Sequence, residues 1–193
     1  MRELVFLLEE PSAKAMLESL LPRMLDARIA VRCVPFEGKQ DLEKQLIRKI
    51  RAYLNPHARF IVLRDQDSHP DCVAVKQHLL GLCAATGKAE RCLVRIACRE
   101  LETFYLADLR AVDQGLVMTN LAGQQQSRKF RAPDQLGSPS AELRTLTKRR
   151  YEKVAGSRAI GRYLGLDNAR SPSFFNLISA IRRMESELLG EEA

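Results

Sequence analysis

The chain has 193 residues, of which 46% are hydrophobic and 28% are charged, so it has the length of one domain and the composition of a globular protein. No apolar run approaches the roughly 18 residues that a membrane helix needs, and the first apolar run is too short for a signal peptide, so we expect a cytoplasmic protein. A net charge of +7 favours an anionic partner such as nucleic acid, although many basic proteins bind nothing anionic.

The first 113 residues alternate between strand and helix patterns. Short apolar runs predict strands at 4–8, 29–34, 59–63 and 91–97, and apolar residues at helical spacing predict helices at 11–25, 41–54, from 69 onward, and at 100–113. Strands that alternate with helices of this length indicate an α/β fold with a mostly parallel central sheet, flanked by helices on both faces. Ligands of such sheets bind outside the carboxyl ends of the strands.

The composition changes near residue 121. We expect an α/β core at 1–120, a polar connection at 121–140, and a helical, basic C-terminal extension at 141–193 that packs on or beside the core. Its last amphipathic helix is predicted at 172–189. Between Asn120 and Arg183 there are 13 Lys or Arg residues against 4 Asp or Glu, so the positive charge is concentrated in this part of the chain.

The cysteines and histidines form no recognisable framework. Five cysteines without a Cys-x-x-Cys pair favour reduced thiols over disulfides, and the three histidines lack zinc-ligand spacing with them.

Acidic residues follow three of the predicted strands directly. The pairs are Glu9 and Glu10, Asp65 and Asp67, and Glu100 and Glu102. The carboxyl ends of parallel strands lie at one edge of the sheet, so these side chains are expected to meet there. Gathered carboxylates repel one another, and a hard divalent cation such as Mg²⁺ relieves that repulsion. The alternative is that they are solvated loop charges.

This arrangement resembles the Toprim (topoisomerase–primase) superfamily. In that superfamily a glutamate follows the first strand and an Asp-x-Asp motif follows the third strand of a parallel sheet. Glu9 matches the glutamate, and Asp65 with Asp67 matches the motif.

Further blocks are similar to a bacterial Toprim-like family of uncharacterised function. They are Leu8-Glu9-Glu10-Pro11-Ser12, Phe36-Glu37-Gly38-Lys39, Arg64-Asp65-Gln66-Asp67-Ser68, the run from Arg99 to Asp108, Tyr151-Glu152-Lys153, and Arg170-Ser171-Pro172-Ser173-Phe174. Two positions depart from the pattern of that family. Glu10 replaces a glycine, which strains the turn if φ is positive there, and Ala13 replaces a second glutamate.

The resemblance implies a metal-dependent nuclease that hydrolyses phosphodiester bonds in DNA or RNA with Mg²⁺ or Mn²⁺. Asp65 and Asp67 are expected to hold the metal, and Glu9 to complete the site or act as general base. Glu102, favoured over Glu100, is expected to serve a second metal position. Accessory roles are considered for four residues, each of which has a purely structural alternative: Glu10, Lys39 near a phosphate, His69 near the metal, and Asp108 near the site.

The resemblance also implies possible partners. Such proteins are often encoded beside an ATPase of the ABC or SMC type, in cassettes that look like phage defence. The basic C-terminal residues are a candidate phosphate track or a solvated basic face: Arg128, Lys129, Arg131, Lys148, Arg149, Arg150, Arg158, Arg162, Arg182 and Arg183. Two alternatives to the nuclease remain, a non-cleaving regulatory or interaction subunit of an ATPase-containing complex and, with less support, a primase-like nucleotidyl transferase.

Overall fold

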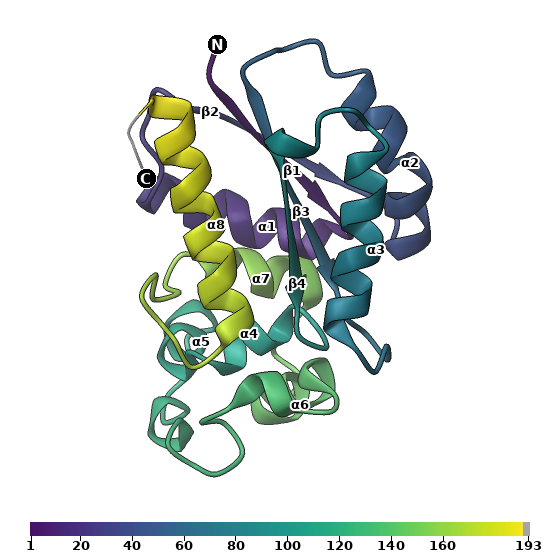
Figure 1. Cartoon of the computed structure of the whole chain (residues 1–193). Helices are drawn as coiled ribbons and strands as arrows, with labels where there is room; N and C mark the ends of the chain where they lie inside the picture. The colour runs from purple at the N-terminus through teal and green to yellow at the C-terminus, as the bar shows by residue number, and fades with distance from the viewer. Residues whose placement is uncertain (191–193) are drawn as a thin grey trace.

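A computed structural model describes residues 1–190, and its centre is a four-stranded parallel sheet in the order β2-β1-β3-β4 (Figure 1). The strands are β1 (Glu3–Leu8), β2 (Ala30–Pro35), β3 (Ala58–Asp65) and β4 (Cys92–Ala97). Every pairing is parallel, and β1 lies between β2 and β3. The predicted parallel α/β sheet is therefore confirmed.

Helices cover both faces of this sheet. Alternate side chains of a strand point to opposite faces, so Leu4 and Phe6 of β1 pack with α1 (Pro11–Leu20) and α8 (Pro172–Leu189). Val5 and Leu7 pack on the other face with α2 (Lys39–Arg51) and α3 (Cys72–Ala84). The long C-terminal helix α8 is thus one of the layers that bury the sheet.

Between β4 and α8 the chain forms shorter helices at the carboxyl end of the sheet (Figure 1). The single helix predicted at 100–113 is two helices, α4 (Glu102–Leu106) and α5 (Leu109–Gly115). Asp108 separates them, because its carboxylate accepts a hydrogen bond from the Ala111 N–H and caps α5. They are followed by α6 (Pro139–Leu146) and α7 (Lys153–Gly161).

Four short 3-10 turns complete the secondary structure, at Leu21–Arg23, Ala89–Arg91, Ala122–Gln124 and Pro133–Gln135. The polar stretch 121–140 packs against the protein through buried Gln125 and Phe130, and the Gln125 amide donates to the carbonyls of Leu106 and Phe130. Residues 191–193 of the predicted extension lie outside the described part. Within residues 1–190, no helix combines the length and apolar character needed to cross a membrane.

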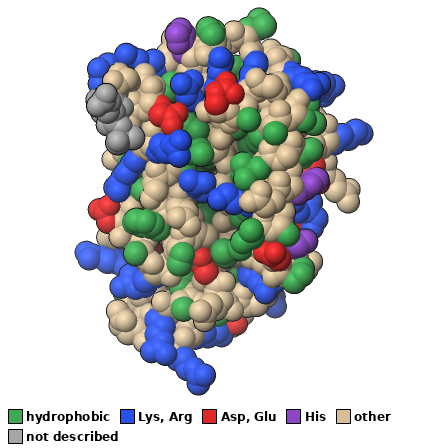
Figure 2. Space-filling model, in the orientation of Figure 1, with side chains coloured by type: hydrophobic (Ala, Val, Ile, Leu, Met, Phe, Trp, Pro, Cys, Tyr) green, Lys and Arg blue, Asp and Glu red, His purple; other side chains and the backbone are tan. Residues whose placement is uncertain are grey.

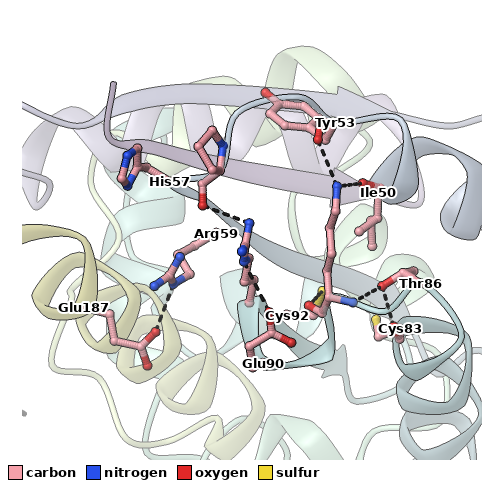
Figure 3. Close-up of polar contacts among 12 residues, drawn as sticks. Ile50, Tyr53, His57, Arg59, Cys83, Thr86, Glu90, Cys92 and Glu187 are labelled. Carbon is pink, nitrogen blue, oxygen red and sulfur yellow. Dashed lines mark hydrogen bonds and ion pairs between the residues drawn. The ribbon is translucent and has the colours of Figure 1, made fainter.

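The amino edge of the sheet is closed by polar contacts (Figure 3). The Lys88 ammonium donates to three carbonyl groups at and beyond the end of α2, those of Ile50, Arg51 and Tyr53. Arg59 at the start of β3 forms an ion pair with Glu187 of α8 at 3.3 Å. These contacts hold the ends of α2 and α8 at the amino edge of the sheet. They do not involve the carboxyl edge.

Candidate functional site at the carboxyl edge of the sheet

Glu9 and Asp65 meet where the two central strands end. Glu9 directly follows β1, and Asp65 is the last residue of β3. The Asp65 N–H donates a hydrogen bond of 2.9 Å to Glu9 Oε2, and the Glu9 N–H donates to the Leu63 carbonyl at 3.2 Å. The pairing of β1 with β3 therefore extends into a contact between the two acidic positions.

The loops beyond β3 and β4 are held against each other. The Asp67 N–H donates to the Arg99 carbonyl at 2.7 Å, and the side chain of buried Gln66 accepts from the Arg99 N–H. Asp67 has a φ of 55° and Arg99 a φ of 64°, a left-handed conformation that is uncommon outside glycine. Strain of this kind concentrates at functional sites.

Asp65 is buried among other acids. Its exposed fraction is 8%. Burial raises the pKa of Asp65 well above its usual value, and the nearby carboxylates of Glu9, Glu10 and Glu102 raise it further, against a hydrogen bond from the Leu101 N–H. Burial also raises the pKa of Glu9, with a further contribution from the charge of Asp67. Hydrogen bonds and nearby positive charges therefore do not fully offset the cost of burying the ionised carboxylates of Glu9 and Asp65.

Glu102 extends this cluster from α4. Only 1% of its surface is exposed, and it accepts a hydrogen bond of 2.9 Å from the Tyr151 hydroxyl. Burial raises the pKa of the Glu102 carboxyl. Lys153, at the start of α7, donates to Glu10 Oε2 at 2.6 Å. The C-terminal part of the chain thus contributes a hydroxyl and an ammonium group to the edge where β1 and β3 end.

Two further cations lie beside the acids. The Lys39 ammonium, from the first residue of α2, donates to Asp67 Oδ2 at 2.9 Å. Arg64 of β3 is largely buried, with its Nε 3.9 Å from Glu9 Oε2 and its Nη1 donating to Glu43 at 2.6 Å. Lys39, predicted to lie near a phosphate, therefore reaches the acidic edge. We name Glu9, Glu10, Asp65, Asp67 and Glu102 the carboxylate cluster.

Glu10 fits its turn without strain. Its φ of −151° and ψ of 165° are extended, so the side chain that replaces glycine causes no left-handed conformation. It accepts from the Ser12 hydroxyl at 2.7 Å as well as from Lys153.

Three of the sequence-predicted residues bind backbone N–H groups outside the cluster. Glu100 accepts from the Ser140 N–H at 2.7 Å, at the start of α6. His69 Nδ1 accepts from the Asp71 N–H in the turn before α3. Asp108 also accepts from the Gly165 N–H at 2.8 Å. Each of these contacts organises a loop or a helix end.

The donor set has the chemistry of a hard-cation site but not a finished coordination shell. All members of the cluster are carboxylates, the ligand class that Mg²⁺ and Mn²⁺ prefer. In the arrangement of residues 1–190, however, no three His, Cys, Asp or Glu side chains are placed so that they could hold one metal ion. Asp67 and Glu10 face the ammonium groups of Lys39 and Lys153 instead.

The basic residues of the C-terminal part are exposed, and Lys and Arg side chains project from the end of the molecule that carries α6 (Figure 2). Some of them are paired: Lys129 with Glu142, Arg158 with Glu18, Arg182 with Asp167, and Arg183 with Glu187. Among residues 1–190, Arg128, Lys148 and Arg149 form no ion pair, and Arg150 reaches only the Val117 carbonyl at 3.4 Å.

Sequence reasoning did not assign Tyr151, Lys153 or Arg64 to the site. The signal for the first two was present, because the block Tyr151-Glu152-Lys153 is part of the family resemblance. The role of that block depends on the packing of α7 on α1, which the sequence does not reveal. The packing is close, because a Cβ added at Gly161 would lie 2.7 Å from the Met16 carbonyl oxygen.

The fold and the site define an α/β protein with a parallel sheet and, at its carboxyl edge, a carboxylate cluster in which Asp65 and Glu102 are buried. The chain belongs to the family described as Domain of unknown function (DUF4276), whose model matches residues 8–182. No curated protein and no solved structure matches the chain.

Proposed function

We propose that the protein is a divalent-metal-dependent nuclease of the Toprim type, which hydrolyses phosphodiester bonds of DNA or RNA. The observation that carries this proposal is the partly buried contact between Glu9 and the Asp65 backbone. A protein gains nothing in stability from acids that raise one another's pKa, so such a cluster is a candidate for binding or catalysis.

The residues that would hold Mg²⁺ or Mn²⁺ are Glu9, Asp65 and Asp67, with Glu102 at a second position. Glu100 is a weaker candidate, because its carboxylate caps the start of α6. A bound metal would supply a positive charge that stabilises the phosphoryl group during hydrolysis. Since Asp67 now faces Lys39, a cation at Asp67 has to replace that ammonium group.

The side chains of the chain have separate tasks in this proposal. Glu9 either completes the metal site or acts as the general base, since a carboxylate whose pKa is raised accepts a proton more readily. Lys153 and Lys39 offer ammonium groups to a phosphate at the rim. Tyr151 positions Glu102 through its hydroxyl.

Nucleic acid is the proposed anionic partner. The strongest candidates for phosphate contacts are Lys148, Arg149 and Arg150, because they have no carboxylate partner in the described chain. Arg182 and Arg183 are weaker candidates, because each would have to leave Asp167 or Glu187.

Metal binding and cleavage are tested together. Mn²⁺ binding to the purified protein is measured by calorimetry, and cleavage of single- and double-stranded DNA and RNA is measured in Mg²⁺ and Mn²⁺. Asp65→Asn is expected to weaken Mn²⁺ binding at least tenfold and cleavage about 100-fold. Glu90→Gln, an exposed acid at the amino edge, is the matched control and should change neither. Unchanged Mn²⁺ binding in Asp65→Asn would overturn the proposal.

A second candidate is a non-cleaving subunit of an ATPase-containing complex, such as one with an ABC- or SMC-type ATPase that acts in phage defence. The observation in its favour is that Lys39 and Lys153 already provide counter-ions for Asp67 and Glu10. It predicts no cleavage and no Mn²⁺ binding alone, and co-purification with the ATPase encoded nearby. Mn²⁺-dependent cleavage by the isolated protein would overturn this alternative.

A further inference from the structure

A cavity of about 420 Å³ lies beside the end of α6, away from the residues of the carboxylate cluster. Its size is within the roughly 300–1,000 Å³ of small-molecule sites. The apolar side chains of Met118, Leu121 and Leu146 form part of its lining. Asn120 and Gln124 contribute amides to it. The cavity therefore offers both an apolar wall and polar groups.

One wall of the cavity is fixed by a single carboxylate. Asp113 of α5 accepts hydrogen bonds from the Leu121 N–H at 3.0 Å and from the Ala122 N–H at 2.9 Å. The Asp113 carbonyl accepts from the Met118 N–H at 2.8 Å. The loop that carries Met118 and Asn120 thus has a defined shape, and the Asp113 carboxylate is occupied by backbone groups.

The lining of the cavity also carries two positive charges. Lys148 and Arg150 both line the cavity. Within residues 1–190 the Lys148 ammonium has no hydrogen-bond or ion-pair partner, and the Arg150 guanidinium donates only to the Val117 carbonyl, at 3.4 Å. Two cations without a carboxylate partner, next to a concave apolar surface, are suited to a ligand that is anionic at one end.

The backbone around these cations is held in an unusual conformation. Val117, Asn120, Lys148 and Arg149 all have positive φ, at 51°, 72°, 49° and 64°. Val117 is β-branched and 86% exposed, so neither burial nor residue type explains its left-handed conformation. Both walls of the cavity are therefore shaped by conformations that persist only when the surrounding structure fixes them.

The cavity is connected to the carboxylate cluster by one short segment. Tyr151 follows Arg150 directly, and its hydroxyl donates to Glu102 at 2.9 Å. Lys153, two residues further on, contacts Glu10. The segment from Arg150 to Lys153 therefore contributes side chains both to the cavity and to the carboxylate cluster.

We propose that this cavity binds one nucleotide unit, with its phosphate on Lys148 and Arg150 and its base against Met118, Leu121 and Leu146. A base offers an apolar face and hydrogen-bonding edges, which match the apolar wall and the amides of the cavity. The inference rests on the proposed function in one respect: the nuclease proposal is the reason for taking a nucleic-acid strand, and not a free nucleotide, as the natural ligand.

The test measures binding without catalysis. Anisotropy of a short fluorescein-labelled oligothymidylate and calorimetry with 5′-AMP are carried out in EDTA. Lys148→Asn suits a left-handed residue, because Asn tolerates that conformation, and it is combined with Arg150→Gln. The double variant is expected to weaken binding at least tenfold. The slope of log affinity against log salt should become shallower by about 0.7, the value for one phosphate contact on a single strand.

The control removes the same charge elsewhere. Lys44→Gln with Lys49→Gln neutralises two exposed lysines of α2 and should change affinity less than about twofold. If the cavity variant, and not the control, loses binding of both oligothymidylate and 5′-AMP, the cavity is a nucleotide site. If 5′-AMP does not bind even to the wild type and the cavity variant loses binding of oligothymidylate, the cavity is a site for one unit within a strand. Equal weakening by the control, or inorganic phosphate that binds as tightly as 5′-AMP, overturns the inference.

The outcomes also separate the two proposals. A protein that binds nucleotides through Lys148 and Arg150 but never cleaves them retains this inference and loses the proposed nuclease. A protein that cleaves nucleic acid, but whose double variant binds oligothymidylate like the wild type, retains the nuclease and loses the cavity.

Discussion

Each edge of the sheet buries an acid, and the pKa of that acid is shifted in opposite directions at the two edges. At the amino edge, Glu3 is 4% exposed and accepts hydrogen bonds from the Tyr53 hydroxyl at 2.7 Å, from Asn55 at 3.0 Å and from Arg32 at 3.1 Å. Burial alone would raise the pKa of Glu3, but these bonds outweigh it and hold that pKa below its usual value. At the carboxyl edge, Asp65 is 8% exposed and its pKa is raised.

This difference distinguishes an acid whose ionised form stabilises the fold, Glu3, from acids whose ionised form destabilises it. The neighbours of Glu3 are donors and a cation, and Tyr53 is itself tied through its carbonyl to Lys88 (Figure 3). The neighbours of Asp65 are mostly other carboxylates. Proteins retain such unfavourable groups chiefly where binding or catalysis needs them. The carboxyl edge is therefore the functional edge in our interpretation.

The largest expected effect on stability is at the amino edge. Glu3→Gln keeps the shape of the side chain but replaces the charged acceptor of three hydrogen bonds by a neutral amide. We expect a loss of about 2 kcal/mol in the free energy of unfolding, measured by urea denaturation, since hydrogen bonds to charged groups contribute about 1.5–3 kcal/mol each. Glu90→Gln, at an exposed ion pair on the same edge, should change stability by less than about 0.5 kcal/mol. A stability equal to wild type in Glu3→Gln would remove the contrast between the edges.

The same isosteric change at Asp65 is expected to have the opposite sign. Asp65→Asn removes a buried charge that Glu9, Glu10 and Glu102 repel, while the side-chain oxygen that faces the Leu101 N–H can be kept. We expect a gain of about 1 kcal/mol at pH 7, which corresponds to a rise of about 2–4 °C in Tm for a chain of this size. Thermal denaturation monitored by circular dichroism measures it. A lower Tm in a fully folded Asp65→Asn would show that the ionised acid stabilises the fold.

The pH dependence gives a third, smaller contrast. Because the pKa of Asp65 is raised in the folded state, folding takes up a proton, so stability should rise as the pH falls from 7.5 towards 5. Glu3 has a lowered pKa, so its contribution is complete above the unfolded value of about 4.3 and is lost only at lower pH. Between pH 7.5 and 5, Tm should therefore rise by a few degrees in the wild type and less in Asp65→Asn. Parallel profiles for the two proteins would mean that Asp65 does not titrate in this range.

The four strands, and the acidic residues that follow them, could be predicted from the sequence because both depend on local patterns. Apolar runs identified all four strands, and parallel strands necessarily place Glu9 and Asp65 at the same edge. What the sequence could not reveal is that the loops after β3 and β4 bond to each other through Asp67 and Arg99, because that contact joins residues far apart in the chain.

The C-terminal contribution to the site was the less predictable part. A run of basic residues is equally compatible with a solvated surface, and nothing in its spacing indicates that Lys153 reaches Glu10, more than 140 residues away. Likewise, the helix predicted at 100–113 is interrupted because Asp108 caps a new helix and binds the Gly165 N–H, a tertiary contact that overrides local helical spacing. Contacts between distant segments decided both cases.

The smallest expected effect on stability tests whether an ammonium group stands in for a metal at the carboxyl edge. The Lys39 and Asp67 side chains are 44% and 31% exposed, so their ion pair is screened by water, and Lys39→Gln should change the free energy of unfolding by less than about 0.5 kcal/mol. If Lys39 competes with a divalent cation for Asp67, the same variant should bind Mn²⁺ several-fold more tightly in calorimetry. Lys44→Gln, on the same helix without an ion pair, should leave the Mn²⁺ affinity unchanged. A weaker Mn²⁺ affinity in Lys39→Gln would mean that the ammonium group helps to assemble the site, and would contradict competition between Lys39 and the cation for Asp67.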